Sequence, residues 1–206
     1  MERELKFLLD HAHIPALPNG YRVAEAQPTL HLLDEYLDYR GQILAAGWRL
    51  RRRRSDGEAL RYTLKSERTA GTSGPLSERM EIERTPEQNE ELPSEIVATL
   101  AKAGVDVAHV LDRLQPYLTL RQERQPVALS NSDGELALLS VDEVRAGAPI
   151  PEGEHRWTEL EIEFLTSLSE GEVAQLAKEL DDALRNEPGV SPSTESKAER
   201  ARRLAL

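Results

Sequence analysis

Residues 159–164 (ELEIEF) decide the fold class, because charged and apolar side chains alternate strictly along them. In an extended chain the three glutamates share one face and the three apolar side chains share the other. The same period of two recurs in four further segments: residues 1–9, 49–54, 60–65 and 79–83. Such alternation predicts half-buried β-strands rather than helices.

The rest of the pattern completes an α+β fold. Three more strands are expected at about residues 29–38, 116–129 and 135–143. Hairpin turns are predicted where Asp-Gly interrupts the strands, at residues 55–58 (SDGE) and 131–134 (NSDG). Helical spacing occurs in three segments: residues 94–103, 169–184 and 198–206. About eight strands and a few peripheral helices predict an antiparallel β-barrel or a strongly curved sheet.

The length of 206 residues suits a single domain over residues 1–206, in which residues 187–206 form a linker and a terminal helix. A C-terminal partner domain in a longer parent protein stays open. The chain has no Cys, which excludes disulfides and thiolate chemistry. No apolar run approaches the roughly 18 residues of a membrane span, and no signal peptide follows Met1. A cytoplasmic protein without a membrane partner is expected.

The net charge of -11 conceals one strongly basic segment. Residues 49–68 carry eight Lys or Arg and three Asp or Glu, a local charge of +5 that leaves -16 for the remainder. An acidic chain with one basic segment is a poor general binder of nucleic acid, because phosphate affinity grows with the number of cations presented. Converging cations suit a compact, highly charged small anion instead.

Acidic and basic side chains fall on different predicted strands. Carboxylates alternate in residues 2–4, 81–83 and 159–163, whereas cations do so in residues 51–53 and 61–65. One interpretation is a charged face in water, as antiparallel sheets often have. The other is a closed sheet with these faces inward, since a solvated face usually mixes both signs along a strand. A charged lumen must be wet, and its glutamates would suit Mg²⁺ or Mn²⁺ while its Arg and Lys suit phosphate.

Two other clusters point less specifically to a function. His11 and His13 have a spacing found in metal sites, but a metal centre needs three or more convergent ligands, so a solvated loop is preferred. The arginines of residues 49–54 could form a nucleic-acid patch. On a strand, however, successive arginines point to opposite faces, so the run divides and this interpretation is set aside.

Several motifs, taken in order, resemble those of the CYTH domain, or triphosphate tunnel metalloenzyme, superfamily. Residues 2–6 (ERELK) resemble its N-terminal Glu-x-Glu-x-Lys signature, and residues 34–38 (DEYLD) resemble its Tyr-x-Asp strand. The later matches are residues 47–53 (GWRLRRR), 63–65 (TLK), 79–83 (RMEIE), 119–124 (TLRQER), Asp142, 159–163 (ELEIE) and 196–197 (SK). The first motif is weak alone, but about eight in order between residue 2 and about residue 203 are a specific signal.

The resemblance implies an eight-stranded antiparallel barrel that forms a tunnel for a triphosphate, with helices outside. Members hydrolyse inorganic triphosphate, thiamine triphosphate or nucleoside triphosphates, or cyclise ATP, with Mg²⁺ or Mn²⁺. By position it implies that the metal ligands come from six glutamates: Glu2, Glu4, Glu81, Glu83, Glu159 and Glu161. It implies that eight cations hold the triphosphate: Lys6, Arg51, Arg53, Lys65, Arg79, Arg121, Arg124 and Lys197. Lys6, Glu4 and Glu81 are the expected catalytic residues, around a water oriented by metal and carboxylates.

The sequence departs from the family pattern at two positions. Tyr39 stands where Thr is usual, and Glu123 falls where a third cation is often found. The leading hypothesis is a Mg²⁺- or Mn²⁺-dependent hydrolase of inorganic triphosphate, because the motifs address phosphate or metal and none addresses a base. An adenylate cyclase of the same fold and a non-catalytic polyphosphate sensor are the alternatives. Six lumen carboxylates speak against the sensor, since anion binding alone has no use for them.

Overall fold

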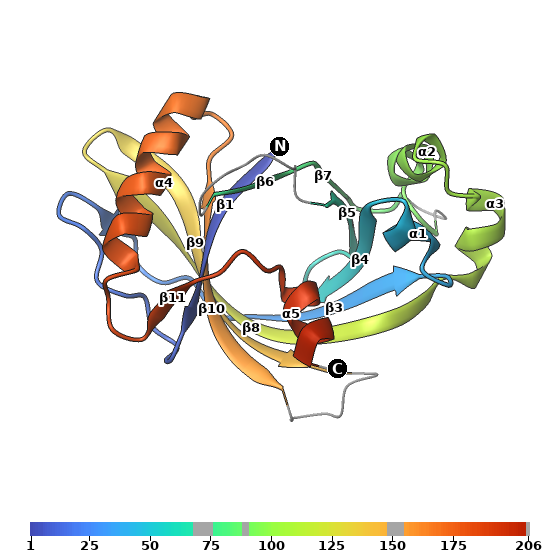
Figure 1. The fold of residues 1–206 in the computed structure, drawn as a ribbon, viewed down its shortest axis with the longest axis horizontal. Coiled ribbons are helices and arrows are strands. Elements are labelled where there is room, and N and C mark those ends of the chain that lie inside the picture. The colour runs from blue at the N-terminus through green and yellow to red at the C-terminus, as the bar shows by residue number, and fades with distance from the viewer. Residues whose placement is uncertain (68–75, 88–90, 148–154, 205–206) are drawn as a thin grey trace.

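The computed structural model describes residues 1–67, 76–87, 91–147 and 155–204, and its centre is one antiparallel sheet curved into a ring (Figure 1). The strands are β1 (Glu2–Leu9), β2 (Arg22–Val23), β3 (Leu30–Asp38), β4 (Trp48–Ser55), β5 (Arg61–Ser66), β6 (Ser77–Arg79), β7 (Glu81–Arg84), β8 (Gln115–Asn131), β9 (Gly134–Ala146), β10 (Arg156–Phe164) and β11 (Val190–Pro192). The helices are α1 (Gln42–Ala45), α2 (Ser94–Lys102), α3 (Val107–Val110), α4 (Glu170–Leu184) and α5 (Lys197–Leu204), with a short 3-10 helix at Leu111–Arg113.

The sheet closes on itself through one interrupted strand. β6 pairs with β1, β7 pairs with β5, and Met80 alone separates β6 from β7. The circuit therefore runs β1-β10-β9-β8-β3-β4-β5-β7 and returns through β6 to β1. Counted with β6 and β7 as one, these are the eight strands of the predicted barrel. The described sheet has 11 strands because β6 and β7 are separate and because β2 and β11 add short pairings to β8 and β1.

The apolar faces of most strands point outward and are covered by helices. Leu5 and Phe7 of β1 belong to a core cluster that includes Leu180 of α4, which crosses that side of the ring (Figure 1). A second cluster on the opposite side joins Leu50 of β4 to Ile96 of α2. The charged faces are thereby turned inward, which confirms the closed-sheet interpretation over a charged face in bulk water.

One end of the lumen is apolar and is covered by α5. Leu120 of β8 and Val144 of β9 are fully or almost fully buried, and they pack with Tyr36 of β3 against Ala198 and Ala201 of α5. Figure 1 shows α5 lying against the rim of the ring. Helix α5 therefore fixes where the polar part of the lumen ends.

The sequence patterns placed the long elements correctly and missed short ones. All eight predicted strands, both hairpin turns and the helices at α2, α4 and α5 are present, although residues 205–206 of the last predicted helix lie outside the described residues. The elements α1, α3, β2 and β11 were not predicted, because two to four residues give no measurable period. Met80, which the alternation of residues 79–83 puts on the apolar face with Ile82, is 53% exposed, and the strand is interrupted there.

None of the helices in the described ranges is long and apolar enough to cross a lipid bilayer.

Candidate active site

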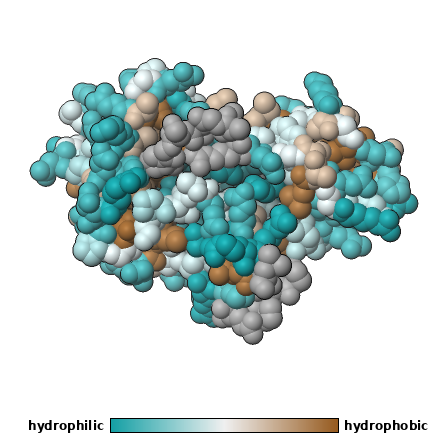
Figure 2. Space-filling view, viewed as in Figure 1, coloured by the Kyte–Doolittle hydropathy of each residue, from teal (hydrophilic) through white to brown (hydrophobic). Residues whose placement is uncertain are grey.

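The inner face of the ring encloses a cavity of about 490 Å³. Eleven of the fourteen site residues predicted from the sequence line it: Glu2, Lys6, Arg51, Arg53, Lys65, Arg79, Glu81, Glu83, Arg124, Glu161 and Lys197. Ten of them converge because the period-two alternation puts every second side chain of the strands on the inside of the ring, and Lys197 is added by α5. The surface at the middle of the face shown in Figure 2 is correspondingly mostly hydrophilic.

Two further predicted glutamates are buried directly behind the cavity wall. The Oε1 atom of Glu4 lies 3.3 Å from Lys6 Nζ and 3.3 Å from Arg79 Nη2. Oε1 of Glu159 lies 2.6 Å from Lys197 Nζ, and its Oε2 accepts a 2.8 Å hydrogen bond from the indole of Trp157. Both carboxylates are thus one side chain away from the cavity.

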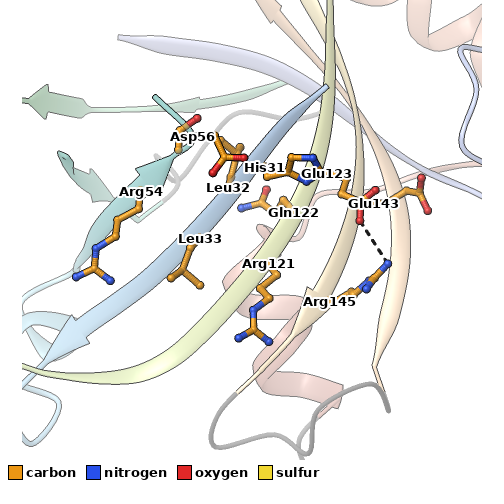
Figure 3. Close-up of a pocket in the computed structure, with 11 residues that line it drawn as sticks. His31, Leu32, Leu33, Arg54, Asp56, Arg121, Gln122, Glu123, Glu143 and Arg145 are labelled. Atoms are coloured by element: carbon orange, nitrogen blue, oxygen red, sulfur yellow. Dashed lines mark hydrogen bonds and ion pairs between the residues drawn. The ribbon is translucent and has the colours of Figure 1, made fainter. Parts of the chain in front are cut away.

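Arg121 is the one predicted site residue that the structure does not bring to the cavity. It lines a separate pocket on the outside of the barrel with Leu33, Arg54 and the ion pair of Glu123 with Arg145 (Figure 3). The physical reason is strand parity, since Arg121 and Glu123 share one face of β8. Gln122 and Arg124 occupy the inner face instead, so Glu123 does not interrupt the row of inner cations.

Three carboxylates, of which Glu161 lines the cavity and the other two are buried beside it, form the one group among the described residues that could hold a metal ion. Asp142 of β9 and Glu159 and Glu161 of β10 each offer an oxygen, and these oxygens lie within 4.8 Å of one another. Lys197 Nζ contacts all three, at 2.9, 2.6 and 2.7 Å respectively. We call Asp142, Glu159 and Glu161 the carboxylate cluster. Hard oxygen donors held on adjacent rigid strands suit Mg²⁺ or Mn²⁺.

Two more cations reach the carboxylate cluster from other strands. Arg124 holds Asp142 with two hydrogen bonds of 2.8 and 2.6 Å and places Nη2 2.7 Å from Glu161 Oε2. Lys6 Nζ lies 2.7 Å from Glu161 Oε1. Burial by itself would raise the pKa of Glu161, but Lys197, Lys6 and Arg124 outweigh it and hold that pKa well below its usual range. Burial likewise opposes the ionisation of Asp142, but Arg124 and Lys197 lower its pKa, so Asp142 and Glu161 are both ionised at neutral pH.

Asp34 of β3 is the centre of a second group of ion pairs and was not assigned a role from the sequence. It is fully buried and accepts two hydrogen bonds from Arg53, of 2.6 and 2.7 Å, and one of 2.6 Å from Gln122. Arg51 Nη1 lies 3.5 Å from the same carboxylate, and Arg51 Nη2 donates to Thr63 at 2.9 Å. Asp34 thus fixes two predicted phosphate ligands. No alternation singles it out in the sequence, because Asp34 is one of two adjacent acids that follow two adjacent leucines.

A third group of ion pairs lies where β1 meets β5, β6 and β7. Lys65 Nζ is 2.7 Å from Glu2 and 3.0 Å from Glu81. Arg79 is buried, with Nε 3.8 Å from Glu2, and it donates to Ser77 at 2.8 Å. The strand break at Met80 lets Arg79 pair toward β1 while Glu81 pairs toward β5.

Glu163 continues the row of glutamates on β10 and lines the cavity, and within the described ranges it forms no ion pair with a Lys or Arg. Partial burial and the neighbouring carboxylate of Glu2 raise its pKa to about 7, against the smaller opposing effect of Lys65. The sequence pattern placed Glu163 on the inner face but gave no reason to single it out.

Comparison with known proteins agrees with this geometry. The family model of the CYTH domain matches residues 1–201. The chain belongs to the CYTH domain family. This confirms the resemblance found in the sequence motifs, and it accounts for the common pattern of acidic and basic strands around one lumen.

Solved structures share the CYTH fold at low sequence identity. The PH1819 protein from Pyrococcus horikoshii OT3 aligns with a TM-score of 0.59 and 18% identity over 99% of each chain. HpAC1 from Hippeastrum, named as an adenylyl cyclase and described as having a dominant triphosphatase activity, aligns with a TM-score of 0.60 and 19% identity, over 100% of this chain and 97% of that one. A protein from Bacillus halodurans, named as an adenylate cyclase, gives 0.54 and 17% over 84% and 82%.

A comparison with curated protein sequences gives no significant match. These three structural likenesses, each below 20% identity, show the fold alone.

Proposed function

We propose that the chain hydrolyses inorganic triphosphate in a reaction that depends on Mg²⁺ or Mn²⁺. One observation carries the proposal: seven predicted cations line a single cavity, and Glu161 joins that cavity to the carboxylate cluster. Carboxylates that hold a divalent cation, facing Arg and Lys that hold phosphate oxygens, are what metal-assisted phosphoryl transfer requires. Two named CYTH-fold neighbours carry triphosphatase or cyclase descriptions, which agrees with a triphosphate as the substrate.

The residues divide into two sets by chemistry. The carboxylate cluster and Glu4 would hold metal, and Glu2, Glu81 and Glu83 supply further carboxylates on the opposite wall. When bound, the metal neutralises charge on the phosphoryl oxygens and orients the attacking water. Arg51 and Arg124 bring guanidinium groups to the cavity, and guanidinium groups suit phosphate oxygens.

Lys6 lies between these two sets. Its ammonium is buried between Glu4 and Glu161, which with Glu159 raise its pKa above the usual lysine range although burial alone would lower it. Lys6 is therefore a permanent cation and cannot serve as the base. Its role in the proposal is to position the attacking water and a phosphate oxygen.

The shape of the lumen favours inorganic triphosphate over a nucleotide. Among the described residues that line the cavity, Tyr36 supplies the one aromatic ring, and it packs in the apolar cluster beneath α5. A purine would need an apolar platform and partners for its ring nitrogens. The walls of this cavity instead carry charged side chains on nearly every inward strand position.

The test measures phosphate and pyrophosphate release from inorganic triphosphate, ATP and thiamine triphosphate, each with Mg²⁺, with Mn²⁺ and with chelator. We expect metal-dependent release that is fastest with inorganic triphosphate. Glu161→Gln should reduce turnover by about 100-fold or more, because it removes a carboxylate shared by metal and three cations. Glu143→Gln, on the outer face of β9, is the matched control and should behave as wild type.

Three outcomes would contradict the proposal in different ways. Cyclic AMP produced from ATP would establish the cyclase alternative. Tight binding of triphosphate without release would establish the polyphosphate sensor. Equal release with metal and with chelator would refute the metal dependence.

A further inference from the structure

Lys197 occupies the position that the carboxylate cluster offers to a metal. Its ammonium contacts one oxygen of each of the three carboxylates, at distances between 2.6 and 2.9 Å. Its side chain is only 6% exposed. A divalent cation coordinated by the same three oxygens could not share that space with the ammonium group.

Lys197 is held at the carboxylate cluster by its position at the capped N-terminus of α5. Lys197 is the first residue of α5, and Ser196 and Glu199 cap that helix reciprocally, with hydrogen bonds of 2.7 and 3.2 Å. Glu199 also pairs with Arg49 of β4 at 2.6 Å. The helix is thus anchored to the barrel by contacts that do not involve Lys197, so this side chain can leave the cluster while α5 stays in place.

The local charge balance also sets Lys197 against a metal. Counted with Glu4, which shares Lys6, the four carboxylates are matched by four cations: Lys197, Arg124, Lys6 and Arg79. A divalent ion added to this neutral group would create a buried excess of positive charge, which is costly in a low-dielectric interior. Displacing Lys197 from the cluster removes the steric conflict with the metal. The excess positive charge that remains can then be neutralised by a bound anion.

We propose that Lys197 is an internal competitor of the metal, which occupies the carboxylate cluster until a divalent cation displaces it toward the cavity, where it then faces the phosphate. This rests on the proposed function only in that a metal binds the cluster. Displacement of Lys197 couples the two binding events, because the metal releases an amine that can then bind the triphosphate. Thermodynamic linkage requires that triphosphate binding raise the metal affinity by the same factor.

The chain contains a natural reporter for this exchange. The indole of Trp157 donates to Glu159 of the cluster at 2.8 Å, whereas Trp48 packs in the separate apolar cluster around α2. In a Trp48→Phe background, fluorescence therefore reports on the cluster through Trp157 alone. Mn²⁺ is the probe, since a paramagnetic ion beside the indole quenches its emission.

The first experiment titrates Mn²⁺ without any phosphate, in the Trp48→Phe background and in the same background with Lys197→Met. We expect Lys197→Met to bind Mn²⁺ about tenfold more tightly or better, within the usual range of coupling between sites. The control, Lys65→Met, removes the same charge from the same cavity but from a lysine that pairs with Glu2 and Glu81, so its Mn²⁺ affinity should change far less.

The second experiment uses the unaltered chain, in case Lys197→Met does not fold. An acetylating reagent followed by peptide mass spectrometry should leave Lys197 unmodified in chelator and modify it in Mg²⁺. Lys178, which is 79% exposed, should be modified equally in both conditions. These readouts do not depend on turnover, so they can fail while hydrolysis is observed.

The outcomes separate the possibilities. Equal Mn²⁺ affinity with and without Lys197, or equal gains from Lys197→Met and Lys65→Met, would overturn the competition. Lys197 that stays unmodified in Mg²⁺, while Mn²⁺ quenches Trp157, would also overturn it. No quenching in either protein would overturn the metal site at the cluster as well.

Discussion

Replacing Asp34 by Asn should destabilise the protein more than almost any other single polar change. The carboxylate is fully buried and is held by the bidentate contact of Arg53 and by Gln122. In Asp34→Asn the buried guanidinium of Arg53 loses its counter-ion and Gln122 loses a charged acceptor. Breaking one partner of a buried ion pair costs about 3–5 kcal/mol, which is a large share of the stability of an ordinary domain.

The pH dependence of that loss follows from the pKa of Asp34. Burial opposes its ionisation, but Arg51 and Arg53 outweigh burial and hold the pKa well below the usual range. A depressed carboxyl pKa adds stability that is complete above the unfolded pKa of about 4 and is lost as the pH falls further. The difference between the wild type and Asp34→Asn should therefore be constant between about pH 8 and pH 5 and shrink below about pH 4.

The measurement is urea unfolding followed by circular dichroism at several pH values. Asp182→Asn is the matched control, because it breaks the exposed ion pair of Asp182 with Lys178 on α4 and should cause no measurable loss. The double variant Asp34→Asn/Arg53→Met should recover part of the stability, because it removes the uncompensated charge. A loss below about 1 kcal/mol at pH 7 would refute the view that Asp34 is the essential counter-ion of Arg53.

Three further predictions test other parts of the structure. Arg124→Gln should raise the KM for triphosphate by about tenfold or more, whereas Arg121→Gln, on the outer face of β8, should leave it unchanged; steady-state kinetics decide. Glu163→Gln should stabilise the metal-free protein more at pH 8 than at pH 5, as measured by urea unfolding at both pH values. The reason is that the pKa of Glu163 is raised to about 7 in the folded protein, so the stability of the wild type falls as the pH rises toward that value. Ser169→Ala should cost about 1 kcal/mol in urea unfolding, because Ser169 forms a reciprocal capping box with Glu172 at the start of α4, and an equal loss in exposed Ser191→Ala would contradict it.

The period of two predicted the ring of strands because it specifies each strand and its inner face at the same time. It could not show that Met80 interrupts the closing strand, since the residues on either side keep the alternation. The short strand β11, inside the segment expected to be a linker, depends on pairing with β1 that no local pattern encodes. Such tertiary pairings are invisible to propensity alone.

The residues of the candidate site could be predicted from the sequence wherever the alternation within a strand showed which side chains face inward. Parity within β8 separates Arg121 from Arg124, but the motif alignment treated both as inner residues, and the structure corrects Arg121. Asp34 and Asp142 matter through their partners on neighbouring strands, namely Arg53 and Arg124. Which acid meets which base is set by strand register across the sheet, which alternation within one strand cannot supply.

The buried charges of this barrel are better explained by binding than by stability. A buried ion pair contributes little compared with apolar side chains of the same volume, because desolvation cancels most of the attraction. An eight-stranded barrel is just wide enough for side chains to fill its interior, and the α5 end of this lumen is filled in that way by Leu120, Val144 and Tyr36. A few residues further along the same three strands, the inward positions are occupied by Asp34, Arg124 and Asp142. The chain therefore packs one end of its lumen with apolar side chains and the rest with paired acids and bases. In those pairs a bound metal can replace a cation as the partner of a carboxylate, and a bound polyanion can replace a carboxylate as the partner of a cation.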